Sequence, residues 1–94
     1  MRCANARHIL VKTKGEAEEL KTRLAAGEDF SKLAKKYSKC NTAKSFGDLG
    51  QVTPGQMLKP VDTIIFKKKP NVVHGPVKTK FGYHLVEVVF RSDK

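Results

Sequence analysis

The sequence predicts an α+β domain in which helices pack around an antiparallel sheet. Apolar and polar residues alternate near both ends of the chain, at residues 6–11 and 83–90, as expected for strands. Between them, residues 16–26 and 30–37 carry apolar side chains at helical spacing. Glycine-containing turns join short extended pieces in the C-terminal half, which favours antiparallel neighbours. With 94 residues we expect one domain, 1–94, with a modest core.

The two N-terminal helices are expected to follow each other closely. The first has an apolar stripe made by Ala17, Leu20 and Leu24. Asp29 is a favourable N-cap for the second helix, whose buried face begins at Phe30. The short connection between the helices requires them to pack against each other.

The C-terminal half is expected to alternate short strands with one helix. Residues 47–52 read as a turn that leads into a short strand, 59–66 as a helix, and 77–79 as an extended piece before the last strand. Pro60 suits the first helical turn, and Pro70 prevents continuation of the helix.

His8 and His84 lie on the two terminal strands, each on a face shared with apolar residues. His8 alternates with Leu10, and His84 with Val86 and Val88. A histidine in such a setting is usually a hydrogen-bonded core residue. The terminal strands of small sheets often pair centrally, however, so the two rings can touch and fix each other's tautomers.

Cys40 is a second candidate reactive group, because it lies in a polar loop. A free cysteine is more often inert than reactive. A metal site formed by Cys40, His8, His74 and His84 is disfavoured, because the chain has no closely spaced ligand pair. No nucleophile-elbow or phosphate-loop motif occurs. We therefore expect neither a metal nor a cofactor.

The net charge of +10 has two interpretations. The 19 Lys and Arg residues keep a small domain soluble, or they attract nucleic acid, anionic membranes or acidic proteins. The charge is spread along the chain without interleaved aromatic residues, which favours the first interpretation. Two cysteines, no apolar run of membrane-spanning length and no apolar leader segment predict a soluble cytoplasmic protein.

Six short motifs occur in order over about residues 5 to 91, essentially the whole chain. They are His8-Ile9-Leu10-Val11-Lys12, Phe30-x-x-Leu33-Ala34, Gly47-Asp48-Leu49-Gly50, Gly55-Gln56-Met57, Gly75-Pro76-Val77 and Phe81-Gly82-Tyr83-His84. In this order and spacing the chain resembles the parvulin family of peptidyl-prolyl cis/trans isomerases, in particular its small stand-alone bacterial or archaeal members.

The resemblance implies a four-stranded antiparallel sheet wrapped by about four helices, a parvulin-like and FKBP-like superfold, with a shallow site on one sheet face. The residues that match the family's catalytic network are His8, Cys40, Thr79 and His84. Those that match its proline-binding pocket are Leu49, Met57, Val61 and Phe81, and Val61 stands where the family usually has phenylalanine. We expect this valine to widen the pocket and to affect substrate affinity more than the fold.

The segment after the first strand, residues 12–15, is short. Family members that require a phosphorylated residue before proline have a longer, arginine-rich loop there. Lys12 and Lys14 attract an anion without the fixed fork of a guanidinium group. We therefore expect no strict requirement for phosphate.

The function implied is isomerisation of X-Pro bonds in peptides and unfolded proteins by a monomeric folding helper, through a non-covalent mechanism. The alternative is a basic binding module that holds nucleic acid, an anionic membrane or unfolded chains, with weak or no isomerase activity.

Overall fold

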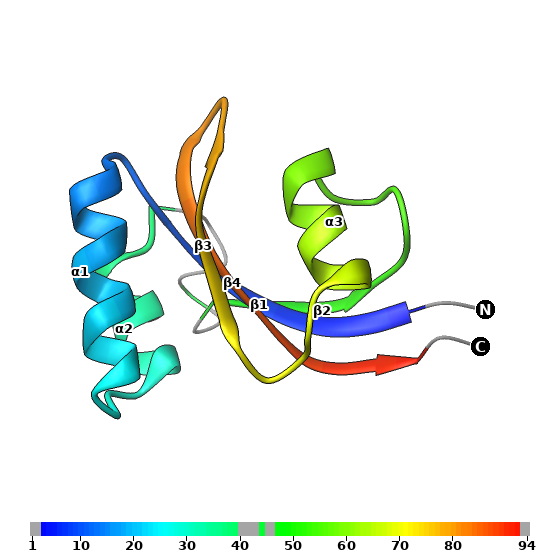
Figure 1. Cartoon of the computed structure of the whole chain (residues 1–94), viewed down its shortest axis with the longest axis horizontal. Coiled ribbons are helices and arrows are strands. Elements are labelled where there is room, and N and C mark those ends of the chain that lie inside the picture. Colours follow the sequence, from blue (N-terminus) through cyan, green and yellow to red (C-terminus); the bar gives the residue numbers. More distant parts are fainter. Residues whose placement is uncertain (1–2, 40–43, 45–46, 93–94) are drawn as a thin grey trace.

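The fold is known from a computed structural model that describes residues 3–39, 44 and 47–92. Its elements in chain order are β1 (Cys3–Val11), α1 (Lys14–Ala25), α2 (Phe30–Tyr37), β2 (Asp48–Val52), α3 (Lys59–Lys67), β3 (Val73–Thr79) and β4 (Gly82–Ser92). The strands form one antiparallel sheet in the order β2-β1-β4-β3 (Figure 1). The predicted α+β class and four-stranded sheet are confirmed. The described residues contain three helices of this kind, where about four were expected.

The first and last strands are the central pair of the sheet. Their register runs from Cys3 opposite Ser92 to Val11 opposite Tyr83, with Leu10 opposite His84. Central strands have neighbours on both sides, so their side chains are the most easily buried. The pairing therefore brings the two ends of the sequence together at the middle of the sheet.

Three elements begin two or more residues before their predicted starts. β1 begins at Cys3 because this end pairs with β4, and β3 begins at Val73 because Val73 pairs with Glu87. Helix α1 begins at Lys14 because the side chain of Thr13 accepts a hydrogen bond from the backbone N–H of Glu16 at 3.2 Å. A partner strand or a cap fixes each of these boundaries, and apolar periodicity alone does not reveal them.

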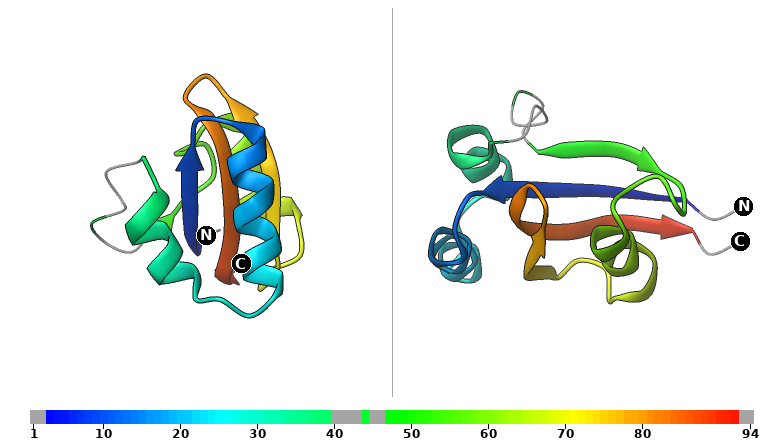
Figure 2. Two further views of the ribbon diagram at one scale, coloured as in Figure 1. Left: turned by 90° about the vertical axis from the view of Figure 1, so that its left-hand side faces the viewer. Right: turned by 90° about the horizontal axis from the view of Figure 1, so that it is seen from above.

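Two hydrophobic cores lie on opposite faces of the sheet. Helices α1 and α2 cover one face and α3 covers part of the other (Figures 1 and 2). The core under α3 is made by Ala4, Ala6, Val52, Val61, Ile64, Ile65, Phe66, Val86 and Val88. The core under α1 and α2 is made by Ile9, Val11, Ala17, Leu20, Phe30, Leu33, Ala34 and Leu85. Strand alternation thus assigns the even-numbered residues of β4 from 84 to 88 to the α3 face.

Candidate active site

His8 of β1 and His84 of β4 contact each other on the α3 face of the sheet. Their Nδ1 atoms are 3.2 Å apart, and the rings are stacked with centroids 5.4 Å apart and planes inclined by 17°. The two residues are diagonal neighbours, since Leu10 is the residue directly opposite His84. The rings therefore approach as the alternation pattern and the central pairing of the terminal strands suggested.

Both imidazoles are buried and uncharged at neutral pH. His8 is 3% exposed and His84 is 4% exposed. Burial, and to a smaller extent the neighbouring His84, lowers the pKa of His8 to about 4. Burial also lowers the pKa of His84. In a neutral pair, the N–H at one Nδ1 donates a hydrogen bond to the unprotonated Nδ1 of the other ring, and there is no charge repulsion between them.

Thr79, at the end of β3, extends this network. Its Oγ1 atom lies 2.8 Å from Nε2 of His84, and the same oxygen accepts the backbone N–H of Phe81 at 3.2 Å. The β3–β4 turn brings these residues together, because Thr79 pairs with Gly82. Both nitrogens of His84 therefore have a hydrogen-bond partner, and the ring is held in one orientation.

Gly47 supports the backbone at His8. It has a φ of 82°, and its carbonyl oxygen accepts the backbone N–H of His8 at 2.9 Å. A Cβ atom at this position would lie 2.6 Å from the carbonyl oxygen of His8. Only glycine combines this conformation with such a close approach, so Gly47 helps to fix the strand that carries His8.

An open groove of about 450 Å³ lies over the histidine pair. The described residues that line it are His8, Leu10, Lys39, Gln56, Met57, Leu58, Phe81 and His84. Phe81 is 60% exposed, so its ring is accessible to a ligand in the groove. Apolar walls above a few polar groups are the usual composition of a small-ligand site.

The predicted site residues fall into three groups. His8, His84, Met57 and Phe81 line the groove, and Thr79 is hydrogen-bonded to His84 behind it. Leu49 and Val61 are not among the lining residues: Leu49 is half-buried against the core under α3, and Val61 is 1% exposed within that core. Cys40 lies outside the described residues. The roles assigned to all of these residues stay predictions.

Four lining residues were not identified from the sequence: Leu10, Lys39, Gln56 and Leu58. Leu10 shares its strand face with His8, so alternation carried a signal for it. Gln56 and Leu58 flank Met57 in the segment that precedes α3. Lys39 had no local signal, because its place at the groove depends on a contact between the end of α2 and β1.

No group of three or more potential metal ligands occurs within the described part of the chain. His74 does not join the histidine pair. Its Nε2 atom lies 2.8 Å from the carbonyl oxygen of Lys69.

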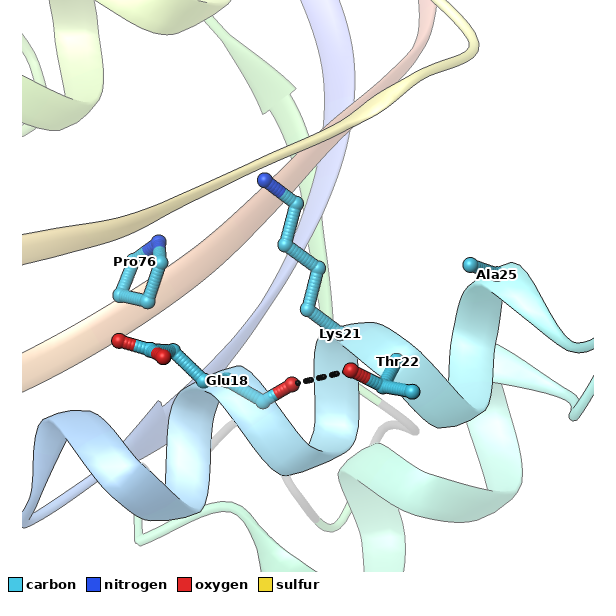
Figure 3. Close-up of a pocket in the computed structure, with 5 residues that line it drawn as sticks. All are labelled: Glu18, Lys21, Thr22, Ala25 and Pro76. Carbon is cyan, nitrogen blue, oxygen red and sulfur yellow. Dashed lines mark hydrogen bonds between the residues drawn. The ribbon is translucent and has the colours of Figure 1, made fainter.

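A second groove, of about 460 Å³, lies between α1 and β3. Lys21 points from α1 toward β3 (Figure 3), and its ammonium group donates to the carbonyl oxygen of Gly75 at 2.7 Å. The hydroxyl of Thr22 donates to the carbonyl oxygen of Glu18 at 3.0 Å. These polar groups already have intramolecular partners. The hydrogen bond from Lys21 connects α1 to the edge strand β3.

Residues 8–89 match the family model described as Rotamase, the PPIC-type PPIASE domain. The chain belongs to this family. In a similar parvulin, NmPin of Nitrosopumilus maritimus, 38% of the aligned residues are identical, the TM-score is 0.85, and the match covers 94% of this chain and 96% of that one. The parvulin resemblance seen in the sequence is therefore confirmed.

Longer parvulin relatives contain a similar domain. The foldase protein PrsA of Geobacillus sp. (strain WCH70) is 48% identical over 90 residues, which is 95% of this chain and 33% of that protein. PrsA from Bacillus subtilis has 42% identity and a TM-score of 0.86, covering 92% of this chain and 34% of that one. This parvulin chain thus spans about a third of the length of these PrsA relatives. Within the described residues, no helix is long and apolar enough to span a membrane.

Proposed function

We propose that this parvulin domain is a peptidyl-prolyl cis/trans isomerase that acts on X-Pro bonds of peptides and unfolded proteins. The observation that carries the proposal is the neutral His8–His84 pair, tied to Thr79 and placed beneath an apolar groove. Membership of the PPIC-type family supports it. A role as a folding helper is supported by the similarity to proteins named foldases.

The reaction requires stabilisation of a twisted amide. Rotation about a peptide bond has a barrier of about 18–20 kcal/mol, and for X-Pro bonds it takes tens of seconds or longer. An acceleration of about 10⁵-fold requires the barrier to fall by roughly 7 kcal/mol. Rotation breaks no covalent bond, so the protein's own groups can supply this by binding the twisted form better than the planar form.

The groove has two parts suited to this task. Met57 and Phe81 provide apolar surface on which a proline ring can be held, so that one end of the rotating bond is fixed. The loss of amide resonance makes the twisted bond less polar, so an apolar surface favours it over the planar amide. The His8–His84–Thr79 network supplies preorganised polar groups beside the rotating bond.

The mechanism proposed is non-covalent, and Cys40 provides its test. In a Cys40→Ser variant a hydroxyl replaces the thiol, so nucleophilic attack by a thiolate is lost while most of the shape remains. We expect this variant to keep substantial activity. A well-folded Cys40→Ser protein without activity would refute the non-covalent mechanism.

The proposed activity is tested by exchange NMR on short X-Pro peptides and by refolding of a protein whose slow phase is limited by proline isomerisation. We expect acceleration of both, without any need for phosphate on the residue before proline. The absence of acceleration with a folded sample would contradict the proposal.

Binding of polyanions is the second candidate function, supported by the net charge of +10. Titration with DNA and with anionic vesicles at two salt concentrations tests it, because charge-driven binding weakens steeply with salt. Salt-sensitive binding without isomerisation would favour this candidate. The cytoplasmic location and the monomeric state stay predictions, and sedimentation of the purified chain tests the second.

A further inference from the structure

The loop that joins β2 to α3, residues 53–58, forms one wall of the groove over the histidine pair (Figure 1). Its last three residues, Gln56, Met57 and Leu58, line that groove. Met57 is also partly buried against the core under α3. The position of this wall relative to the histidines therefore depends on how the loop is held.

Local hydrogen bonds give the loop its shape. The backbone N–H of Gln56 donates to the carbonyl oxygen of Thr53 at 3.1 Å, and the side-chain oxygen of Gln56 accepts the backbone N–H of Thr53, also at 3.1 Å. These two bonds close a turn, but they do not join it to α3. The N-cap of α3 is Leu58, whose side chain has no oxygen or nitrogen with which to cap the helix. The turn and the helix therefore require a further connection.

Asp62 supplies this connection from the first turns of α3. Its Oδ1 atom accepts the backbone N–H of Gly55, seven residues earlier, at 2.9 Å. Its own backbone N–H donates to the carbonyl oxygen of Leu58 at 2.8 Å, so Asp62 is fixed within the helix. The helix in turn packs on the sheet through Val61 and Ile65. Because hydrogen bonds to a carboxylate are stronger than those between neutral groups, Asp62 holds the loop to the rigid part of the domain.

We infer that Asp62 is a positioning residue for substrate binding, which holds the loop 53–58 so that Met57 forms a wall of the groove. The inference rests on the proposed isomerase function. Asp62 is not among the described residues that line the groove, so it acts through the loop. The proline ring contacts Met57 in both the planar and the twisted amide. Loss of the wall therefore weakens the binding of both forms, which raises KM and leaves kcat unchanged.

The test uses Asp62→Ala, which removes the acceptor, and Asp62→Asn, which removes the charge but keeps a side-chain oxygen. Exchange NMR on an Ala-Pro peptide gives kcat and KM, and chemical-shift titration gives the dissociation constant. For Asp62→Ala we expect KM and the dissociation constant to rise about fivefold, which corresponds to about 1 kcal/mol, as for one lost hydrogen bond. We expect kcat to stay unchanged. Asp62→Asn should restore the wild-type KM.

A second measurement reports on the loop itself. Amide hydrogen exchange at Gly55 should be slow in the wild type and in Asp62→Asn, and faster in Asp62→Ala, together with a shift of the Met57 methyl resonance. Thr63→Ala is the matched control. It removes a hydroxyl that donates to the carbonyl oxygen of Lys59 at 3.0 Å within the same helix, outside the groove lining. It should change neither KM nor Gly55 exchange. Because the hydrogen bond of Asp62 is exposed, we expect all three variants to fold.

The outcomes separate a positioning role from a structural one. An unchanged KM in Asp62→Ala, with faster exchange at Gly55, would overturn the inference, because the loop would then be held without any consequence for binding. An equal rise of KM in Asp62→Asn would also overturn it, because the charge and not the hydrogen bond would be responsible.

The same data distinguish this inference from the proposed function. Absence of acceleration by the wild-type protein would refute isomerisation, whereas weaker peptide binding by Asp62→Ala would still support the positioning role. Acceleration by the wild type, with a fall in kcat alone in Asp62→Ala, would overturn the inference and leave isomerisation intact.

Discussion

The two faces of the sheet differ in the kind of polar group that they hold and in how deeply it is buried. Next to the core under α1 and α2 lies a charged pair. The Nε of Arg7 donates to the carboxylate of Glu87 at 2.6 Å, and the guanidinium carbon lies 4.6 Å from the centre of the Phe30 ring. This pair retains contact with solvent, with side chains 31% and 15% exposed. On the α3 face, by contrast, His8 and His84 are almost completely buried.

The difference follows from which groups can lose their charge. An arginine stays protonated at all accessible pH values, so it requires a carboxylate and some water. An imidazole becomes neutral when it is buried, so two of them can satisfy each other without a counter-ion. The α1–α2 face therefore holds a charged pair that keeps its contact with solvent, and the α3 face can hold a neutral polar network beneath the groove that contains the histidines.

The largest expected loss of stability comes from a substitution in the core under α1 and α2. Leu85 is fully buried there, and its neighbour Val86 is fully buried on the α3 face. We expect Leu85→Ala to cost about 2–5 kcal/mol of unfolding free energy, measured by urea denaturation. Activity per folded molecule should stay unchanged. Val86→Ala is the matched variant on the other face, and it should lower both stability and activity. Equal loss of activity in the two variants would contradict the division between the faces.

Acidification should have the second-largest effect on stability, through His8 on the α3 face. The pKa of His8 is about 4 in the folded protein and 6.5 without the fold. Between these values the unfolded chain binds a proton that the folded chain does not, so stability is present above pH 6.5 and is lost as the pH falls toward 4. The loss from this residue amounts to about 3 kcal/mol at most. NMR titration of the His8 ring checks it, and protonation of that ring near pH 6.5 would disprove the prediction.

Removal of one ring should affect stability and function together. His84→Leu takes away the partner that both His8 and Thr79 contact. We expect a loss of about 1–3 kcal/mol in unfolding free energy. We also expect activity to fall by about tenfold or more. His74→Leu is the control, since His74 lies outside the groove lining and should leave activity unchanged. Full stability of His84→Leu together with complete inactivity would argue against a structural role for the pair.

The smallest effect on stability is expected from loss of the hydrogen bond between α1 and β3. Lys21→Met keeps the length of the side chain but removes its hydrogen bond to Gly75. The expected cost is about 1 kcal/mol, measured by thermal unfolding. Isomerase activity should be unchanged, because Lys21 lies outside the groove that contains the histidines. A clear change in activity would mean that the contact between α1 and β3 affects the groove that contains the histidines.

Much of the fold was determined by the sequence itself. Alternation at 6–11 and 83–90 assigned His8 and His84 to particular strand faces, because side chains of a strand alternate whatever its partner is. Helical periodicity and Asp29 predicted α2 with its observed bounds. The ordered motifs indicated the parvulin family, and with it a sheet with a site on one face.

Tertiary structure decided the parts that depend on contacts between distant segments. The 3.2 Å contact between the histidines exists because β1 and β4 are central neighbours, and no local pattern specifies that distance. Val61, which is predicted to line the pocket, is 1% exposed in the core under α3, and this placement depends on how α3 packs on the sheet. Lys39 lines the groove because its backbone N–H, just after α2, donates a hydrogen bond to the carbonyl oxygen of Leu10 in β1. Local sequence therefore sets which way side chains face, whereas long-range packing determines which of them meet.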